Sequence, residues 1–332
     1  MPWLRAGRRW RRACPSPPTG RRSAEVREHG NCTRRGGGWR RIARLLGAAL
    51  LAGWGAAGTL HAAIPVKAPP KVTLQSRYFD SSDGVRLHVI ESVPGAAAGT
   101  PVLAFVPGWS MPASIWDAQL RALGASHRTA ALDPRGQGRS ALPAEGYTIE
   151  RRARDIAEFV DRYPRVVLIG WSLGVLEALH YVHAHGDAKV EALVLVDSSV
   201  GEQPPPPEGD FRERLRADRV QTLSSFVHAI FRSKRPPDEL SKLVEGALRL
   251  PLQASIDLLS YPKPREHWRD IAWSFRKPLL YVVTPQFAAQ AANLQRNRPG
   301  TRVEVFSRAG HALFVDEPQR FNRLLEAFVR GL

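Results

Sequence analysis

Cysteine is nearly absent from this chain of 332 residues: it has two, Cys14 and Cys32, and both lie near its start. Residues 64–332 therefore contain no disulfide, no thiolate metal site and no cysteine nucleophile. The sequence also lacks the His and Cys spacings typical of zinc sites and the glycine-rich loop that binds phosphates. We therefore expect an activity that uses neither a metal ion nor another cofactor.

Acidic side chains are scarce at the start of the chain, and most of the positive charge is concentrated there. Residues 1–63 contain 13 arginines, no lysine and two glutamates, a net charge of +11, whereas the whole chain has a net charge of +17. Residues 64–332 thus carry a net charge of only +6, which does not indicate a nucleic-acid surface. We expect this part to act on a small molecule and to bind no nucleic acid. The sequence leaves its oligomeric state open.

Residues 1–63 are typical of a disordered basic leader that contains a signal peptide. Three arginines at 40, 41 and 44 precede an apolar segment at about 45–60, and small residues follow it before Pro65. If the leader is cleaved, we expect a periplasmic or secreted protein. One alternative is a membrane anchor formed by the apolar segment, and another is a true start codon further along the chain.

From residue 72 onward, short apolar runs alternate with helical patterns, which is typical of a mostly parallel α/β sheet. An opening strand pair is expected at 72–79 and 85–91. Further strands are expected at 102–106, 128–132, from 166, and at 192–196, 279–284 and 302–306. Helices are expected at 113–123, 148–163, 173–185, 286–298 and 318–330.

Two details of the helical patterns lead to specific predictions. Thr148 is expected to cap the helix at 148–163, with Arg151, Arg152 and Arg154 on its solvent side. Residues 201–277 are rich in proline and carry helical patterns at 211–228 and 241–248. We interpret them as a helical cap inserted into a domain that spans 64–332.

The chemistry is indicated first by Gly170-Trp171-Ser172-Leu173-Gly174, which follows an apolar run and precedes a helical pattern. This context is typical of a nucleophile elbow, a sharp strand-to-helix turn that raises one serine hydroxyl above the sheet edge. The serine backbone is strained in such a turn, so glycines are needed on both sides. We therefore predict that Ser172 is a nucleophile.

A serine attacks a carbonyl only if a base takes its proton and donors stabilise the oxyanion that forms. His311 is the predicted base because its loop follows the last strand. His180, His183 and His185 fall on the helix at 173–185 and are expected to be surface or packing residues. The predicted oxyanion donors are the backbone amides of Leu173, at the positive end of its helix, and of Trp109, in the loop after the strand at 102–106.

A carboxylate is also needed to orient His311. The stretch from Lys277 to Val303 contains neither Asp nor Glu, so the acid must come from elsewhere. We predict Asp197, at the end of the strand at 192–196. A purely structural Asp197 is the alternative, with Glu202, Asp257 and Asp270 as other candidates for the acid. Asp316 and Glu317 follow His311 closely and are expected to serve the N-terminus of the last helix.

Five segments together resemble the α/β-hydrolase family over residues 72–331. They are Val-Pro-Gly-Trp-Ser at 106–110, Asp-Pro-Arg-Gly-Gln-Gly-Arg-Ser at 133–140, Gly-Trp-Ser-Leu-Gly at 170–174, Leu-Val-Leu-Val-Asp at 193–197 and Gly-His-Ala-Leu-Phe-Val-Asp-Glu-Pro at 310–318. The resemblance implies an α/β-hydrolase fold with an eight-stranded, mostly parallel sheet and a helical cap.

The sequence departs from the family pattern in two places. Pro107-Gly108 replaces the usual His-Gly, and the acid that usually follows the seventh strand is missing. Certain haloalkane dehalogenases of the family take their acid from the end of strand six, which is where Asp197 falls.

A serine at the elbow distinguishes this chain from epoxide hydrolases and haloalkane dehalogenases of the fold, which use aspartate there. The chain is similar to the serine esterase and cofactor-free haloperoxidase-like branch. This implies hydrolysis of carboxylic esters with small or apolar acyl or aryl groups through an acyl-enzyme, and Trp171 is expected to line the pocket. The alternatives are amide or aminopeptide hydrolysis, acyl transfer to another acceptor, and a binding protein without catalysis.

Overall fold

Eight strands form one twisted sheet in the part of the chain that the structure, a computed structural model, describes: residues 72–93, 99–207 and 209–332. The strands are β1 (Thr73–Asp80), β2 (Arg86–Val93), β3 (Val102–Val106), β4 (Thr129–Asp133), β5 (Val166–Trp171), β6 (Val190–Val196), β7 (Leu279–Val283) and β8 (Arg302–Val305). Their order is β1-β2-β4-β3-β5-β6-β7-β8. Among these strands, β2 alone runs in the direction opposite to the other seven, so the sheet is mostly parallel.

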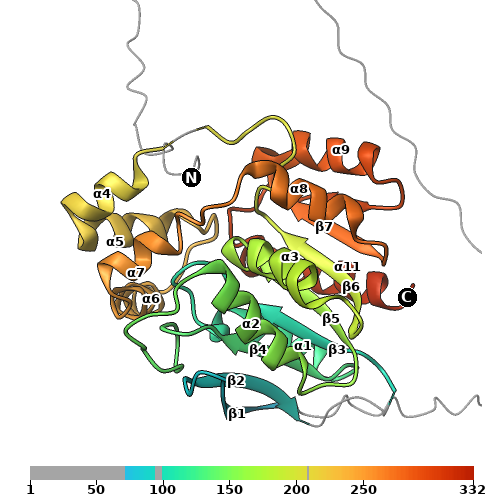
Figure 1. Cartoon of the computed structure of the whole chain (residues 1–332), viewed down its shortest axis with the longest axis horizontal. Coiled ribbons are helices and arrows are strands. Elements are labelled where there is room, and N and C mark those ends of the chain that lie inside the picture. Colours follow the sequence, from blue (N-terminus) through green and yellow to red (C-terminus); the bar gives the residue numbers. More distant parts are fainter. Residues whose placement is uncertain (1–71, 94–98, 208) are drawn as a thin grey trace, which may run out of the picture. The chain divides into compact units, whose positions relative to one another are not determined.

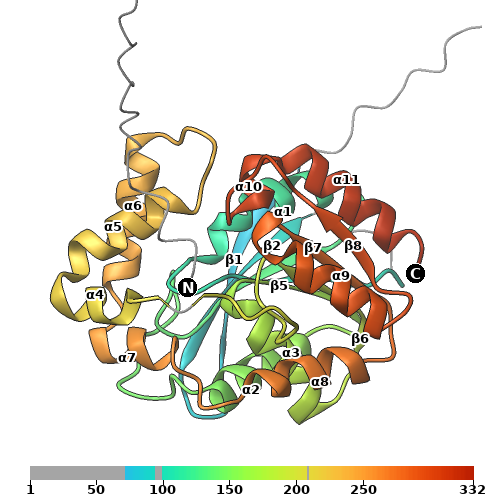
Figure 2. The same ribbon diagram turned by 90° about the horizontal axis from the view of Figure 1, so that it is seen from above.

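Helices cover both faces of this sheet (Figures 1 and 2). On one face lie α1 (Asp117–Leu123) and α11 (Pro318–Val329); on the other lie α2 (Ile149–Val160), α3 (Leu173–His185), α8 (Arg265–Ser274) and α9 (Ala288–Asn297). The strand side chains divide between the two layers: Phe105 of β3 packs with the α1 face and Ala104 with the α3 face. Burial on both faces explains why the central strands β3, β5 and β7 are apolar throughout. The predicted fold is confirmed.

Two predicted helices are each divided. The pattern at 113–123 forms a 3₁₀ turn, η2 (Ala113–Trp116), followed by α1. The pattern at 211–228 forms α4 (Phe211–Ala217) and α5 (Arg219–Ala229), separated at Asp218, whose extended backbone ends the first helix. The Asp218 carboxylate accepts the Gln221 amide at 3.0 Å and so caps the second helix, a role that apolar periodicity alone does not reveal.

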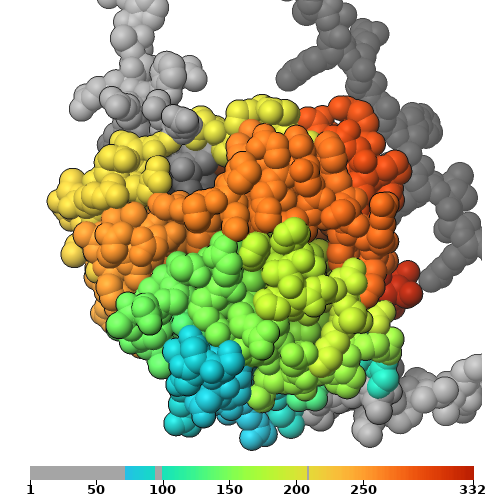
Figure 3. All heavy atoms as spheres, in the orientation of Figure 1, coloured from blue at the N-terminus to red at the C-terminus, as the bar shows by residue number. Residues whose placement is uncertain are grey.

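Within the predicted cap, α4, α5, α6 (Pro237–Leu248) and α7 (Leu252–Asp257) form a lobe to one side of the sheet, which we call the cap lobe (Figures 1 and 2). Its yellow and orange surface borders directly on the green surface around α2 (Figure 3). The remaining helix of the insertion, α8, packs against α3 and belongs to the layer that covers the sheet. No helix in the described ranges has both the length and the apolar character needed to span a bilayer. The predicted leader at 1–63 lies outside those ranges.

The prediction of a solvent-facing Arg152 is wrong. Its side chain is buried, and its guanidinium Nε lies 2.9 Å from Oε1 of Glu177, which is equally buried on α3. Tyr261 donates its hydroxyl to the same oxygen at 2.8 Å. Burying two charges is tolerated when they are paired and hydrogen-bonded. Since Glu177 lies 25 residues away, the helical pattern around Arg152 alone gives no sign of this partner.

Three histidines meet where α3 packs against α8. Nδ1 of His180 lies 3.0 Å from Nε2 of His267, and the His183 ring is 5.1 Å from the His267 ring. Burial, together with the neighbouring His267 and Lys263, lowers the pKa of His180 to about 4. As expected from the sequence, His180 is a packing residue.

This lowered pKa predicts a loss of stability in acid. The unfolded chain binds a proton at His180 near its ordinary pKa of about 6.5, whereas the folded chain resists it down to about 4. Stability should therefore fall as the pH drops through that window. The melting temperature, measured at several pH values across this window for the wild type and for His180→Gln, checks the prediction. The melting temperature of the variant should depend less steeply on pH than that of the wild type. An identical pH dependence in both proteins would contradict the prediction.

Candidate active site

Ser172 lies on a sharp turn between β5 and α3, in a backbone conformation that L-residues rarely adopt (φ 55°, ψ −118°). The turn requires glycine on both sides. A Cβ on Gly170 would lie 2.4 Å from the carbonyl oxygen of Gly174, and a Cβ on Gly174 would lie 2.6 Å from that of Val106. The sequence folds into this turn because only glycine fits at these two positions. The strain is retained where the surrounding packing holds it.

Ser172, His311 and Asp197 are brought together at the carboxyl ends of the parallel strands. The Ser172 hydroxyl lies 2.9 Å from Nε2 of His311, and Nδ1 of that ring lies 2.8 Å from Oδ2 of Asp197. The other carboxylate oxygen accepts the amide of Thr284 at 2.6 Å. Because Asp197 can only accept, Nδ1 carries the proton and Nε2 is free to accept from the serine. All three residues are buried.

The loop after β3 runs directly past Ser172. A Cβ on Gly108 would lie 3.0 Å from the Cβ of Ser172, so a glycine is needed for this approach. Trp109 follows Gly108 in this loop, and Leu173, the residue after Ser172, begins α3. No hydrogen-bond acceptor is found within the described ranges for the backbone amide of Trp109 or that of Leu173. Two unpaired amides beside a serine hydroxyl are suited to bind an oxyanion.

Gln137 lies within Asp-Pro-Arg-Gly-Gln-Gly-Arg-Ser, but the sequence alone does not predict a role for it at the site. Its buried carboxamide donates to the carbonyl oxygens of Gly108, at 3.1 Å, and Met111, at 2.8 Å. Its own oxygen lies 3.4 Å from the guanidinium of Arg152. Gln137 thus connects the buried Arg152–Glu177 ion pair to the loop that carries the Trp109 amide.

Gln137→Leu should therefore lower kcat by about tenfold with a smaller change in KM, because the Trp109 amide acts only on the charge that forms during reaction. Ester hydrolysis and thermal unfolding are measured on the same preparation. A variant that melts earlier but keeps its full kcat would show that Gln137 serves the fold alone.

The two tryptophans beside the site have different surroundings. Trp171, expected to line the pocket, is buried; its indole donates to the His311 carbonyl oxygen at 2.9 Å, and its ring packs edge-on against Phe314. It therefore supports the His311 loop from below and does not line the cavity. The Trp109 side chain points into the cap lobe, where its indole donates to the Ser255 carbonyl oxygen at 2.9 Å.

The other three candidate acids have hydrogen-bond or ion-pair partners other than His311. Glu202 accepts from the Trp273 indole at 2.6 Å, Asp257 from Gln253 at 2.8 Å, and Asp270 pairs with Arg269 at 2.9 Å.

The prediction that Asp316 serves the N-terminus of the last helix is wrong. Its oxygens accept the amides of Gly310 at 2.7 Å, of Arg232 at 2.9 Å and of Ser233 at 2.9 Å. This carboxylate therefore ties the end of α5 to the residue that precedes His311.

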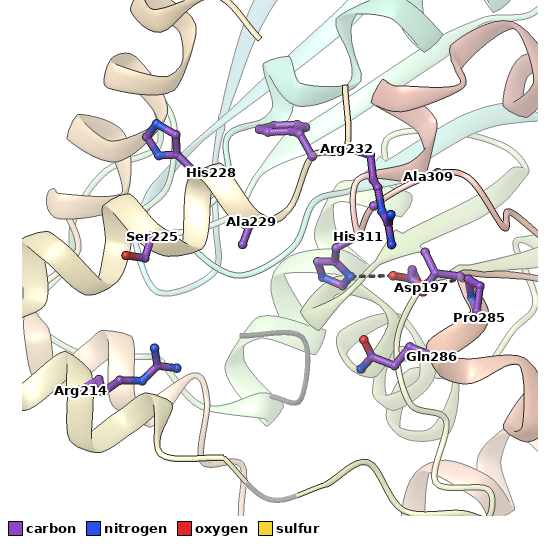
Figure 4. A pocket seen from close by; sticks show the side chains of 13 residues that line it. Asp197, Arg214, Ser225, His228, Ala229, Arg232, Pro285, Gln286, Ala309 and His311 are labelled. Atoms are coloured by element: carbon purple, nitrogen blue, oxygen red, sulfur yellow. Dashed lines mark hydrogen bonds and ion pairs between the residues drawn. The ribbon is translucent and has the colours of Figure 1, made fainter. Parts of the chain in front are cut away.

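A cavity of about 860 Å³ opens beside His311, between the cap lobe and the strand ends (Figure 4). Ser172 is connected to this space through its hydrogen bond to His311, which lines it. The wall is mixed, with apolar, polar and basic side chains from both sides. It consists of Asp197, Arg214, Ser225, His228, Ala229, Phe231, Arg232, Thr284, Pro285, Gln286, Ala309, Gly310 and His311.

Residues 103–324 match the family model of the alpha/beta hydrolase family. The chain is 26% identical to the AB hydrolase superfamily protein YisY of Bacillus subtilis, over 73% of this chain and 96% of that protein. It is 28% identical to the pimeloyl-[acyl-carrier protein] methyl ester esterase of Aeromonas hydrophila, over 69% of this chain and 95% of that protein. The esterase EaEST of Exiguobacterium antarcticum has the same fold, with a TM-score of 0.68 and 24% identity over 77% of this chain and all of that one.

Proposed function

Because this chain belongs to the α/β hydrolase family and is an enzyme of that family, we propose that it hydrolyses carboxylic esters through an acyl-enzyme on Ser172. The observation that carries the proposal is the unbroken hydrogen-bonded chain from Ser172 through His311 to Asp197. It ends beside a cavity that can hold a small ester. Relatives named as esterases support the same reaction class.

In the first half-reaction, Ser172 Oγ attacks the ester carbonyl carbon and its proton passes to Nε2 of His311. Asp197 keeps the ring oriented and stabilises the imidazolium. The negative charge on the former carbonyl oxygen is bound by the amides of Trp109 and Leu173. When the tetrahedral intermediate collapses, the carbon–oxygen bond to the alcohol breaks, and the alcohol takes the proton from Nε2.

The second half-reaction repeats these roles with water. Nε2 of His311 takes one proton from the water as its oxygen attacks the acyl-enzyme carbonyl. The bond to Ser172 then breaks, the serine recovers its proton from Nε2, and the carboxylic acid leaves. Nε2 must carry no proton at the start of each half, and the hydrogen bond from Nδ1 to Asp197 selects the tautomer of the neutral ring in which Nε2 is the acceptor.

The cavity wall suits a small or apolar acyl or aryl group. Phe231, Ala229 and Ala309 supply apolar surface from the end of the cap lobe and from the His311 loop. Apolar walls with a few placed polar groups are typical of small-molecule sites.

A panel of p-nitrophenyl esters of increasing acyl length, with the matching anilides beside them, tests the proposal. We expect hydrolysis of the short and medium esters and labelling of the protein by a fluorophosphonate probe. Preference for the anilides would instead favour amide hydrolysis. Failure of every ester, together with no labelling, would contradict the proposed function.

A further inference from the structure

We propose that the natural substrate carries an anionic group, a carboxylate or a phosphate, and that Arg232 binds it with help from Arg214. This inference rests on the proposed ester hydrolysis and names the class of ester. The site that we assign is the basic part of the cavity wall on the cap side (Figure 4).

Arg232 is exposed in the free protein, and its positive charge is paired with no described group. Within the described ranges, its guanidinium makes no hydrogen bond or ion pair; only its backbone amide is bound, to Asp316. Arg214 does have a partner, with its Nε 3.0 Å from Asp210, but that carboxylate is 75% exposed. An exposed ion pair of this kind is weak and can yield to a better-placed anion.

The carboxylates near these arginines are already occupied. Asp197 is the one acid in the described wall, and its oxygens are bonded to His311 and Thr284. The Asp316 oxygens accept three backbone amides and the hydroxyl of Ser233. A bound ester would therefore meet two guanidinium groups with no free carboxylate among the lining residues. Covering the cavity with an ester that lacks an anion would leave the charge of Arg232 without a partner.

The position of Arg232 places this anion close to the reacting carbonyl. Its amide and that of Gly310 share one oxygen of Asp316, and the Ile230 carbonyl accepts the amide of Ala312 at 2.8 Å. The chain on either side of His311 is thus held against the end of α5. Figure 4 shows the Arg232 side chain extending toward His311 and Asp197, while Arg214 points in from α4. The anion and the ester carbonyl should therefore be separated by only a few bonds.

Arginine is the appropriate residue for this role because its planar group binds carboxylate or phosphate through two parallel hydrogen bonds. Gln286, on the opposite side of the cavity in Figure 4, adds a neutral amide donor. The mixed wall thus fits an apolar chain that ends in an anion.

Matched ester pairs test the proposal. One pair is p-nitrophenyl hydrogen adipate and its methyl-capped form, which places the charge on the acyl side. Another pair is 4-carboxyphenyl butyrate and its methyl ester, which places the charge on the alcohol side. A 4-phosphonophenyl analogue of this ester compares a phosphonate with a carboxylate. In at least one pair, kcat/KM for the charged ester should exceed that for the neutral one by about 10- to 100-fold.

Arg232→Gln should abolish most of this preference, measured as the ratio of kcat/KM values, and Arg214→Gln should reduce it. The matched control is Arg216→Gln. It removes a positive charge from α4, the helix that carries Arg214, but at a residue that does not line the cavity. Adipate or inorganic phosphate should also slow fluorophosphonate labelling of the wild type but not of Arg232→Gln. Hydrolysis of neutral esters with no preference for charged ones would overturn this inference alone, whereas no hydrolysis and no labelling would overturn the proposed function.

Discussion

Replacing Ser172 by alanine should abolish ester hydrolysis, with kcat falling by about a thousandfold or more. The reason is geometric: the turn holds this hydroxyl 2.9 Å from Nε2 of His311, with the amides of Trp109 and Leu173 beside it. Hydrolysis of a p-nitrophenyl ester and fluorophosphonate labelling, followed by mass spectrometry of the labelled peptide, measure the effect.

Ser126→Ala is the matched control, because it removes a hydroxyl at the end of α1 that is bonded only to a backbone carbonyl oxygen. It should keep normal turnover and labelling. Because alanine keeps the Cβ and the backbone conformation at this position and loses only the hydroxyl, the variant should retain the turn and melt close to the wild type. Equal labelling of wild type and Ser172→Ala would assign the nucleophile to another residue.

The features that could be predicted from the sequence are those whose cause is local. The turn at Ser172 depends on two glycines within two residues of it, and the central strands β3, β5 and β7 are short apolar runs because they are covered on both faces. The expectation that Asp197 lies near His311 came from a different kind of observation, the lack of any acid in the usual place. That reasoning worked because parallel strands end at one edge of the sheet, so β6 and β7 are interchangeable as the source of a carboxylate.

The features that could not be predicted depend on partners far apart in the sequence. Arg152 fits a solvent-facing position in its own helix and is buried only because Glu177 lies on the neighbouring helix. Asp316 fits a helix N-terminus but accepts amides from residues more than eighty positions earlier. The two basic residues of the cavity, Arg214 and Arg232, lie in the cap lobe, whose packing no local pattern specifies.

The cap lobe is joined to the active site at two points, which explains why its side chains can select the substrate. Trp109 extends from the loop beside Ser172 and packs edge-on against Phe211 and Phe226, with ring centroids 5.4 Å and 5.2 Å away. Asp316 fixes the other end of the lobe to the loop of His311. The first attachment leads to the backbone amide of Trp109 and the second to the imidazole of His311. The same contacts therefore position both the cavity wall and the groups that act on the ester.

Asp197→Asn should lower kcat by about a hundredfold or more. Two N–H donors meet this carboxylate, Nδ1 of His311 at 2.8 Å and the amide of Thr284 at 2.6 Å. An asparagine has one oxygen, so it can accept only one of them and presents its NH₂ group to the other. The backbone amide of Thr284 cannot change, whereas the imidazole can move its proton to Nε2. In that tautomer His311 can no longer accept the proton of Ser172.

The matched control for Asp197→Asn is a second buried carboxylate that follows β6, Glu202. Glu202→Gln changes a buried carboxylate further along the same segment between β6 and α4, where it accepts from Trp273, and should leave kcat within a small factor of the wild type. Asp197→Asn should also label more slowly with the fluorophosphonate probe, because the nucleophile is no longer activated. If Asp197→Asn kept near-normal turnover while Glu202→Gln lost it, Asp197 would be a structural residue at the end of β6 and Glu202 would orient the base.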